Sequence, residues 1–354
     1  MKKTIIYLCL AGLSAVTQAA PPDNAPLPPA PRALDHPATI SGKAVGSAML
    51  AVARAGDRLL VAGERGIVLY SIDHGKTWIQ ASTPTSVTLT ALRFVDDRRG
   101  WAVGHMGIVL HTDDGGATWH KQLDGLQAAQ LAYATAMRSG DEKAIRQATY
   151  LLTDGPDKPF FDIHIDPSGH GFIIGAYNLI FRTSDGGKHW EDWSARVDNP
   201  RNLHLYGIAQ VGSAIYLVGE QGLILRSTDG GQYFAAASSP YPGSWFGALS
   251  TRQGLLLYGL RGNAFRLPAD GGNWQALQTN SAAAISGATE LSDGRLLLAS
   301  QSGQLLIEEE ARKFVPLAMR SSTPLTAVIE DGNQGLLVAS LRGVLSTPIA
   351  SPNN

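Results

Sequence analysis

The sequence predicts an all-β fold, a seven-bladed β-propeller that carries one helical hairpin as an insertion. Two observations predict it: a unit of about 40 residues recurs along the chain, and each unit reads as short apolar strands separated by glycine-containing turns. One marker residue per unit stands at Gly66, Gly107, Asn178, Gly222, Gly262, Gly303 and Gly343. The markers are 41, 71, 44, 40, 41 and 40 residues apart. A four-stranded propeller blade has a period of roughly 40, so the longest step holds one blade plus an insertion of roughly 30 residues.

The strands nearest the propeller axis are predicted from an apolar segment that precedes each strand–turn–strand unit. These segments lie at 49–53, 89–95, 160–165, 206–211, 246–250, 285–291 and 325–330. Seven such segments fit seven blades. The seventh unit runs out soon after Thr347 without a fourth strand. We therefore expect residues 38–40 to supply that strand and to close the ring, which would also remove an exposed sheet edge.

A turn motif of the form Ser/Thr-x-Asp-x-Gly-x-x-Trp, the Asp-box, recurs in phase with the repeat. Its residues are Asp73, Gly75 and Trp78; Asp114, Gly116 and Trp119; Asp185, Gly187 and Trp190; Asp229, Gly231 and Phe234; and, in a copy one residue short, Asp270 and Trp274. The aspartate can accept backbone N–H groups across a tight turn, glycine supplies left-handed conformations, and the aromatic ring adds buried area. Because the motif recurs whereas an active site would be unique, we expect structural hairpins. The alternative is a row of carboxylates for catalysis or for calcium.

These residues resemble the BNR/Asp-box propellers. The longer unit, in which two glycines precede Thr-x-Asp-Gly-Gly-x-x-Trp, is similar to the photosystem II stability/assembly factor-like propeller family, over roughly residues 45–350. The resemblance implies a seven-bladed, non-catalytic propeller that assists assembly of a membrane complex. It also implies an exported branch outside phototrophs whose members accompany resistance-nodulation-division type transporters. The degenerate boxes of the last two units and the insertion depart from the family pattern.

The insertion at residues 123–158 interrupts the link between the second and third blades, and it reads as a helical hairpin. Segments 126–140 and 141–155 are rich in helix formers, with Asp141 as the expected N-cap and Gly155 as the expected stop. In a propeller this link shares one face with the turns between second and third strands. We therefore expect the hairpin beside a partner-binding face, because arginine and tyrosine are favoured interface anchors. The residues expected to bind the partner are Arg65, His105, Tyr177, Arg261 and Arg342. The alternative is a decoration that binds nothing.

The N-terminus predicts export. Residues 1–20 read as a signal peptide, with Lys2 and Lys3 ahead of an apolar run and small residues at Ala19 and Ala20. Residues 21–35 form a proline-rich linker, and the propeller is expected to occupy 36–354. The one cysteine, Cys9, falls inside the apolar run, so no disulfide is expected. The net charge of −1 argues against a general nucleic-acid binder. We expect a periplasmic protein, or a secreted one, that spans no membrane after signal removal.

No sequence pattern indicates a catalytic, metal or cofactor site. Asp162, His164 and Asp166 alternate on a predicted inner strand and could form a metal or acid–base cluster, but a polar strand edge is the simpler interpretation. A sialidase-like exo-glycosidase is the enzymatic alternative, since such enzymes also use Asp-box propellers; residues 36–50 contain no arginine for the sialidase signature. A glycan-binding lectin is a third class. We expect a non-catalytic, protein-binding assembly factor for an envelope membrane protein complex.

Overall fold

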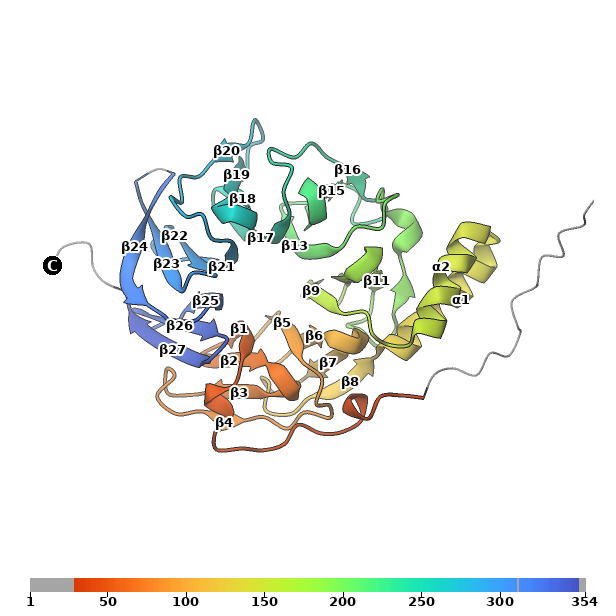
Figure 1. Ribbon diagram of the computed structural model, residues 1–354, viewed down its shortest axis with the longest axis horizontal. Coiled ribbons are helices and arrows are strands. Elements are labelled where there is room, and N and C mark those ends of the chain that lie inside the picture. Colours follow the sequence, from red (N-terminus) through yellow and green to blue (C-terminus); the bar gives the residue numbers. More distant parts are fainter. Residues whose placement is uncertain (1–28, 311, 350–354) are drawn as a thin grey trace, which may run out of the picture.

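The computed structural model describes residues 29–310 and 312–349, and the fold within them is a ring of seven antiparallel sheets around one axis (Figure 1). Six sheets have four strands and one has three. The predicted seven-bladed propeller with a helical insertion is confirmed. The predicted signal peptide, Cys9 and the linker up to residue 28 lie outside the described residues.

Each blade is built from consecutive strands, the first nearest the axis and the last on the rim. Blade 1 contains β1 (Met49–Ala55), β2 (Arg58–Gly63), β3 (Val68–Ser71) and β4 (Ile79–Gln80). Blade 2 contains β5 (Leu89–Phe94), β6 (Gly100–Gly104), β7 (Val109–Thr112) and β8 (His120–Leu123). Blade 3 contains β9 (Phe160–Ile165), β10 (Gly171–Gly175), β11 (Ile180–Thr183) and β12 (Glu191–Asp192). Blade 4 contains β13 (Leu205–Val211), β14 (Ala214–Gly219), β15 (Ile224–Ser227) and β16 (Ala235–Ala236).

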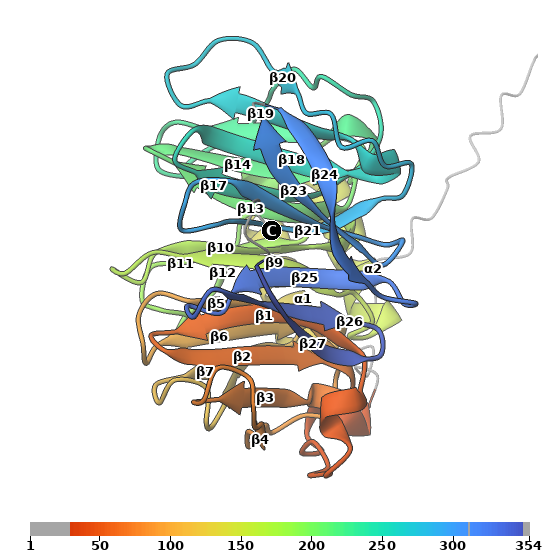
Figure 2. The same cartoon turned by 90° about the vertical axis from the view of Figure 1, so that its left-hand side faces the viewer.

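The remaining blades follow the same plan, with changes at the rim. Blade 5 contains β17 (Trp245–Thr251), β18 (Gly254–Gly259), β19 (Ala264–Pro268) and β20 (Gln275–Ala276). Blade 6 contains β21 (Ile285–Glu290), β22 (Leu296–Ser300), β23 (Gln304–Glu310) and β24 (Lys313–Arg320). Blade 7 contains β25 (Leu325–Glu330), β26 (Gly335–Ser340) and β27 (Gly343–Pro348). Figure 2 shows the outer sides of blades 6 and 7, where β24 is much longer than a two-residue strand such as β4.

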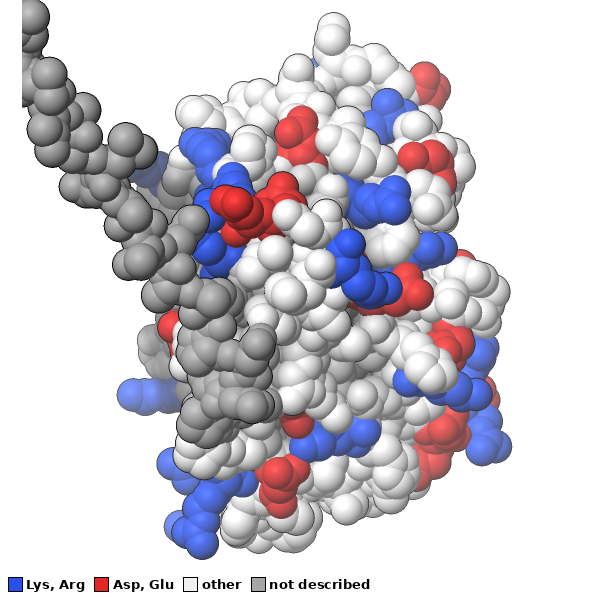
Figure 3. Space-filling view, turned by 90° about the vertical axis from the view of Figure 1, so that its right-hand side faces the viewer, with Lys and Arg blue, Asp and Glu red and all other residues white. Residues whose placement is uncertain are grey.

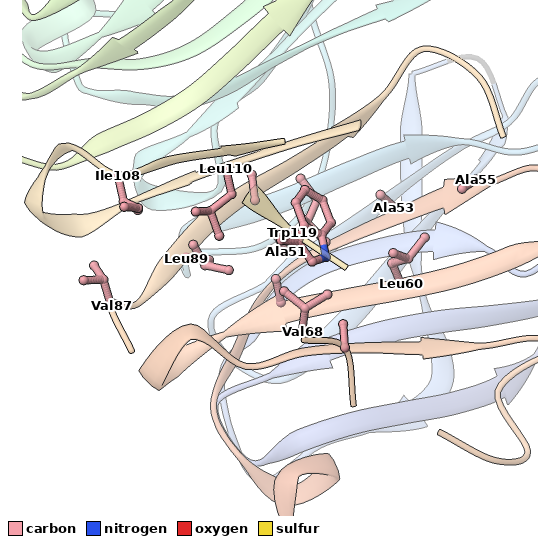
Figure 4. Close-up of a cluster of buried hydrophobic side chains, with 14 of the residues drawn as sticks. Ala51, Ala53, Ala55, Leu60, Val68, Val87, Leu89, Ile108, Leu110 and Trp119 are labelled. Atoms are coloured by element: carbon pink, nitrogen blue, oxygen red, sulfur yellow. The ribbon is translucent and has the colours of Figure 1, made fainter. Parts of the chain in front are cut away.

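Buried apolar side chains between neighbouring blades hold the ring together. Figure 4 shows the cluster between blades 1 and 2, in which Leu60 and Val68 meet Leu89, Leu110 and Trp119. All five are at most 3% exposed. Alternate residues of each strand point to opposite faces of its sheet, so every blade packs against both neighbours. Each of the seven junctions between neighbouring blades has such a cluster, so the core is distributed around the ring.

The ring closes between the first and last blades through their inner strands. β25 lies beside β1 as the other inner strands lie beside their neighbours. The Thr326 hydroxyl donates to the Met49 carbonyl across this seam, at 2.7 Å. Blade 7 itself stays three-stranded within the described residues.

The expected pairing of residues 38–40 with blade 7 is wrong. Ala38 N–H donates to the Thr83 carbonyl at 3.3 Å. The Gln80 amide donates to the Thr39 carbonyl at 3.0 Å, so this segment is held along the rim of blade 1 instead. It belongs to what we call the N-terminal strap, residues 33–46, which includes part of η1 (Arg32–Leu34) and η2 (Ala44–Gly46).

The strap spans the neighbouring blades and is part of the core. Leu34 is 1% exposed in the cluster between blades 1 and 2, although the sequence placed it in the linker. Ala44 packs with Leu337 and Ala339 of blade 7 and with residues of blade 1. The folded part of the chain therefore begins before residue 36, and the strap covers the seam that a fourth strand was expected to close.

The insertion consists of α1 (Gly125–Ser139) and α2 (Glu142–Asp154), and it lies on the outer flank of the ring (Figure 1). Asp124 caps α1 in a capping box, and Asp141 caps α2 by accepting from Ala144 N–H, as the sequence predicted for Asp141. The face of α1 that meets the ring is formed by small residues, which allow close approach. The buried alanines are Ala128, Ala129, Ala132 and Ala136. On this flank lysine and arginine side chains are interspersed with acidic ones (Figure 3).

Candidate functional site

The turns between second and third strands project side chains from one face of the ring, here called the turn face. Five of them are single 3₁₀ turns: η3 (Glu64–Gly66), η4 (His105–Gly107), η5 (Ala176–Asn178), η7 (Glu220–Gly222) and η8 (Leu260–Gly262). The central residue of each has a left-handed backbone, at Arg65, Met106, Tyr177, Gln221 and Arg261, with φ between 51° and 57°. In four of the five turns the next residue is a glycine, and a Cβ on Gly66 would lie 2.0 Å from the Thr85 carbonyl oxygen; in η5 the next residue is Asn178, also with a left-handed backbone. The same strained turn thus recurs, while the side chain that it presents varies.

The residues expected to bind a partner all lie exposed on the turn face, one to a blade. Arg65, Arg261 and Arg342 form no ion pair within the described part of the chain. Tyr177 is 59% exposed, and the Lys158 ammonium group lies 5.6 Å from its ring centroid. These residues are spread around the ring and do not form one cluster.

His105 differs from Arg65, Tyr177 and Arg261 in its position within the turn, and the hairpin differs from its expected place. His105 is exposed, but it occupies the first position of its turn; Met106 takes the left-handed position and packs against the core between blades 1 and 2. The hairpin borders the turn face only at its base, where a Cβ on Gly107 would lie 2.6 Å from Gly125 Cα. Farther along, α1 packs beside β12 on the flank, and α2 packs against α1.

A second feature of the turn face is a hollow at the mouth of the axis, which the sequence analysis missed. In every blade the pairing of the first two strands shifts register around the second residue of the inner strand. Such a bulge redirects a side chain away from the regular sheet. The seven residues are Leu50, Thr90, Phe161, Tyr206, Phe246, Ser286 and Thr326. With Gln301, Pro324, Leu325 and Leu341 they line a cavity of about 460 Å³, which we call the axial mouth.

Three of these seven positions bind the next blade. The hydroxyls of Thr90, Ser286 and Thr326 donate to the carbonyls of Phe160, Leu325 and Met49, at 2.8, 2.5 and 2.7 Å. Each accepting carbonyl belongs to the first residue of the following inner strand. These hydroxyls therefore join blade 2 to 3, blade 6 to 7 and blade 7 to 1.

The other four positions are apolar, and three of them form an aromatic arc on consecutive blades. The Phe161 and Tyr206 centroids are 5.1 Å apart, and those of Tyr206 and Phe246 are 5.9 Å apart. His204 lies between the arc and Tyr177 of the turn face: its ring centroid is 5.9 Å from that of Tyr206 and 4.5 Å from that of Tyr177. Its Nδ1 accepts the Tyr177 backbone N–H at 2.9 Å. Burial, and then the negative charge of Glu220, raise the pKa of the Tyr206 hydroxyl. A column-wise comparison of the second residues of the seven inner strands would have revealed this arc.

The Asp-box turns lie at the opposite end of the third strands. In blade 2 the Asp114 carboxylate accepts from the backbone N–H groups of Ala117 and Thr118, at 2.9 and 3.0 Å. It also accepts from the hydroxyls of Thr118 and Thr112, at 2.6 and 2.8 Å. Each carboxylate oxygen thus has partners inside its own turn. These contacts stabilise the turn, and they account for the aspartate as a structural residue.

The same arrangement recurs in three other blades and fails in the fifth. Ser71, Thr183 and Ser227 donate to Asp73, Asp185 and Asp229 as Thr112 does to Asp114. Hydrogen bonds, first that from the Thr77 hydroxyl, lower the pKa of Asp73 to about 2. In blade 5 the expected box is absent: Leu267 stands where a serine or threonine is needed, and Asp270 is exposed with no hydrogen bond within the described residues. Trp274 is only partly buried, and its indole N–H donates to the Ser238 carbonyl at 3.3 Å.

The alternating residues Asp162, His164 and Asp166 do not form one cluster. Asp162 pairs with Arg93 of blade 2 at 3.1 Å and accepts from Ile208 N–H of blade 4 at 3.2 Å, so it ties three blades together. His164 bonds Gln210, and Asp166 closes its own turn with Ser168. Burial, with the nearby charge of Asp162, raises the pKa of Tyr258 to about 12. Within residues 29–310 and 312–349, no group of three His, Cys, Asp or Glu side chains is arranged to hold a metal ion.

The described helices are also too short or too polar to cross a membrane.

Comparisons with known proteins identify relatives in sequence and in fold. The family model described as photosynthesis system II assembly factor YCF48 matches residues 77–157 and 147–312, more than half of the chain. Photosystem II assembly lipoprotein Ycf48 of Synechococcus sp. (strain CC9902) is 32% identical over 142 residues, which cover 39% of this chain and 42% of that protein. The match therefore spans less than half the length of this curated relative.

Solved structures add the fold. A structure described as YCF48 bound to D1 peptide has a TM-score of 0.63 at 17% identity, with 87% of this chain and 95% of that chain covered. YCF48 from Cyanidioschyzon merolae has a TM-score of 0.63 at 14% identity, covering 88% and 97%. Virginiamycin B lyase from Staphylococcus aureus has a TM-score of 0.61 at 12% identity, covering 88% and 97%. The same fold thus serves both a peptide-bound protein and an enzyme, so the fold alone does not decide the function.

Proposed function

The chain belongs to the photosystem II assembly factor YCF48 family, and from this premise we propose that it is a non-catalytic, exported assembly factor that binds a segment of an envelope membrane protein through its turn face. The observation that carries the proposal is the set of exposed side chains on this face. Arg65, Arg261 and Arg342 form no ion pair within the described residues, and Tyr177 and Leu341 lie exposed on the same side. Arginines and aromatic residues are the side chains that most often dominate binding energy at protein interfaces.

The relatives support a polypeptide as the ligand. One YCF48 structure is described as bound to a D1 peptide, and the curated relative is described as an assembly lipoprotein. We extend to this chain the binding of a membrane-protein segment, with a periplasmic location. A resistance-nodulation-division type transporter as the client is a narrower proposal that rests on the sequence resemblance alone.

The test is capture of the client from the native envelope by crosslinking and mass spectrometry. We expect the Arg65→Ala/Arg261→Ala/Arg342→Ala protein to lose most of the capture seen with the unchanged chain, at an unchanged melting temperature. A matched triple variant at exposed arginines outside the turn face, Arg146→Ala/Arg226→Ala/Arg312→Ala, should capture normally. Equal capture by both variants would place the interface elsewhere. Turnover of aryl-glycosides, sialosides included, would replace the proposal with a glycosidase.

A further inference from the structure

We infer that the axial mouth is a pocket for one aromatic or large aliphatic side chain of the client segment. This inference rests on the proposed function, because it places the ligand on the same face of the ring. It adds the chemistry of the ligand: an extended polypeptide whose apolar side chain enters the mouth while its backbone crosses the turn face.

The seven equivalent positions around the mouth give the first argument. At three of the positions, Thr90, Ser286 and Thr326, the side chain carries a hydroxyl that donates to a carbonyl of the next blade and so helps to hold the ring together. At Phe161, Tyr206 and Phe246 that bond is given up, and the ring still closes. The aromatic arc is therefore not required by the propeller architecture. It places three half-buried rings on consecutive blades around a hollow, an arrangement that leaves apolar surface in contact with water.

The size and lining of the mouth give the second argument. Its volume of about 460 Å³ is within the usual range for ligand pockets and exceeds that of a single aromatic side chain. Rings in edge-to-face contact, such as Tyr206 with Phe246 at 81°, can accept another ring in the same manner. The Tyr206 hydroxyl makes no hydrogen bond within the described residues and could bond a tyrosine or tryptophan.

The polar groups of the mouth favour a peptide over a sugar. Carbohydrate binding also uses aromatic rings, but a sugar needs hydrogen-bond partners for its hydroxyls. Three of the hydroxyls that line the mouth already donate to backbone carbonyls. Those three hydroxyls can still accept a hydrogen bond but have no proton left to donate, and Gln301 and Tyr206 are the lining side chains that can still donate among the described residues. At the border of the mouth on the turn face, the side chains of Tyr177 and Leu341 extend the apolar surface; they are 59% and 45% exposed.

In the experiment, each substitution copies the residue that another blade of the same chain carries at the equivalent position. Phe161→Thr and Phe246→Ser place in blades 3 and 5 the residues that blades 2 and 6 carry at the same position, so the doubly substituted ring should fold. The control is Tyr233→Ser, which removes a 48% exposed ring from a box turn on the opposite face. The probe is an acetylated, amidated peptide, Gly-Ser-Asp-Gly-X-Gly-Asp-Ser, with X as Trp, Leu or Ala. We expect the unchanged chain to bind the Trp peptide roughly tenfold more tightly than the Ala peptide, with Leu between them.

The double variant should bind all three peptides alike, and Tyr233→Ser should behave as the unchanged chain. Equal binding of the three peptides by the unchanged chain, or an unaltered Trp preference in the double variant, would overturn the inference. If the unchanged chain bound glycans on an array, lost that binding in the double variant, and showed no preference among the three peptides, the inference would be overturned in favour of a lectin.

Photo-crosslinking from the native envelope separates this inference from the proposed function. A benzophenone side chain is placed at Gln301 in the mouth, at Arg65 on the turn face, or at Gln232 on the box face. Client crosslinks from Gln301 centred on aromatic or large aliphatic residues would support the inference. Crosslinks from Arg65 without any from Gln301 would overturn it and leave the proposed function standing. Crosslinks from neither would overturn both.

Discussion

Blades 1 to 4 and blade 6 close their outer hairpins by different means. In blades 1 to 4 a short local motif does the work: a serine or threonine and an aspartate bond each other and the turn backbone, as Thr112 and Asp114 do. These turns also receive bonds from the preceding blade. Arg58 donates to the Gly115 carbonyl at 2.8 Å, and the Trp193 indole N–H donates to the Gly231 carbonyl at 2.8 Å.

Blade 6 replaces the local motif with a contact between blades. Glu308 stands where the box has its serine or threonine, five residues after the marker Gly303. Its carboxylate pairs with Arg266 of blade 5 at 3.0 Å, and both side chains are less than 10% exposed. It also accepts the backbone N–H groups of Leu296 and Arg312, both at 3.3 Å. The comparison teaches that in a box turn the central carboxylate is paired inside its own hairpin, whereas the central carboxylate of blade 6 forms a buried ion pair with blade 5.

The largest loss of stability is expected on replacing a box tryptophan whose ring is buried in the core. Trp119 is 3% exposed and its indole N–H donates to the Gly116 carbonyl, whereas Trp274 of the failed fifth box is only partly buried. Trp119→Ala should lower the free energy of unfolding by roughly 3–5 kcal/mol, through lost burial and a cavity. Trp274→Ala should lower it by about 1 kcal/mol. Urea unfolding followed by circular dichroism compares the two; equal losses would mean that Trp274 packs as Trp119 does.

The next effect concerns the ion pair of blade 6. Glu308→Gln keeps the shape but leaves the buried Arg266 guanidinium without a carboxylate, so we expect a loss of about 2–3 kcal/mol in the free energy of unfolding. The double variant Arg266→Met/Glu308→Gln removes both charges while the glutamine carbonyl can still accept the backbone N–H groups of Leu296 and Arg312, so it should unfold closer to the unchanged chain than Glu308→Gln does. A double variant less stable than Glu308→Gln would show that the charge pair is not the source of the effect.

A smaller effect should follow loss of one box aspartate. Asp114→Ala removes the acceptor of two backbone N–H groups and two hydroxyls, and we expect a loss of about 1–3 kcal/mol. Asp270→Ala in blade 5 should change stability by less than about 0.5 kcal/mol, because that carboxylate is exposed and makes no hydrogen bond within the described residues. Equilibrium unfolding of both variants measures the contrast, which vanishes if Asp270 closes its turn in solution.

The smallest effect is one of pH. The folded pKa of Asp73 is lowered from 3.8 to about 2, first by the Thr77 hydroxyl. A carboxylate with a depressed pKa stabilises the fold fully above its unfolded pKa, and that stability is lost as the pH falls through the folded pKa. The melting temperature of Asp73→Asn should therefore approach that of the unchanged chain between pH 5 and pH 2. Asp270→Asn provides the control, and a gap for Asp73→Asn that is constant with pH would contradict the assignment.

Much of the fold could be predicted from the sequence because a propeller repeats one local pattern. Six of the seven markers, Gly66 among them, are glycines at a close approach that leaves no room for a Cβ, and that constraint is visible in each of these units by itself; the third marker is Asn178. Asp141 and Gly155 likewise act on their own helix. The strap could not be predicted in this way, because its position depends on Thr83 and Gln80, which do not belong to the repeated motif.

The candidate site shows the same division. Arg65, Tyr177 and Arg261 are exposed on the turn face, as their place in the repeat predicts, and their role in binding a partner stays a prediction. The axial mouth depends on side chains from all seven blades meeting at one point. Phe161, Tyr206 and Phe246 each read as an ordinary apolar strand residue, and only their common bulge position distinguishes them. The failed fifth box was overestimated because its aspartate, glycines and tryptophan are present while the residue that should bond them is Leu267.

The N-terminal strap has a consequence for how the chain matures. Ala44 packs against Leu337 and Ala339, so the strap lacks part of its packing surface until β26 has been synthesised. Among the first described residues to leave the ribosome are therefore some of the last to reach their final neighbours. The ring itself can close only after β25 has been synthesised, because β25 is the strand of blade 7 that lies beside β1.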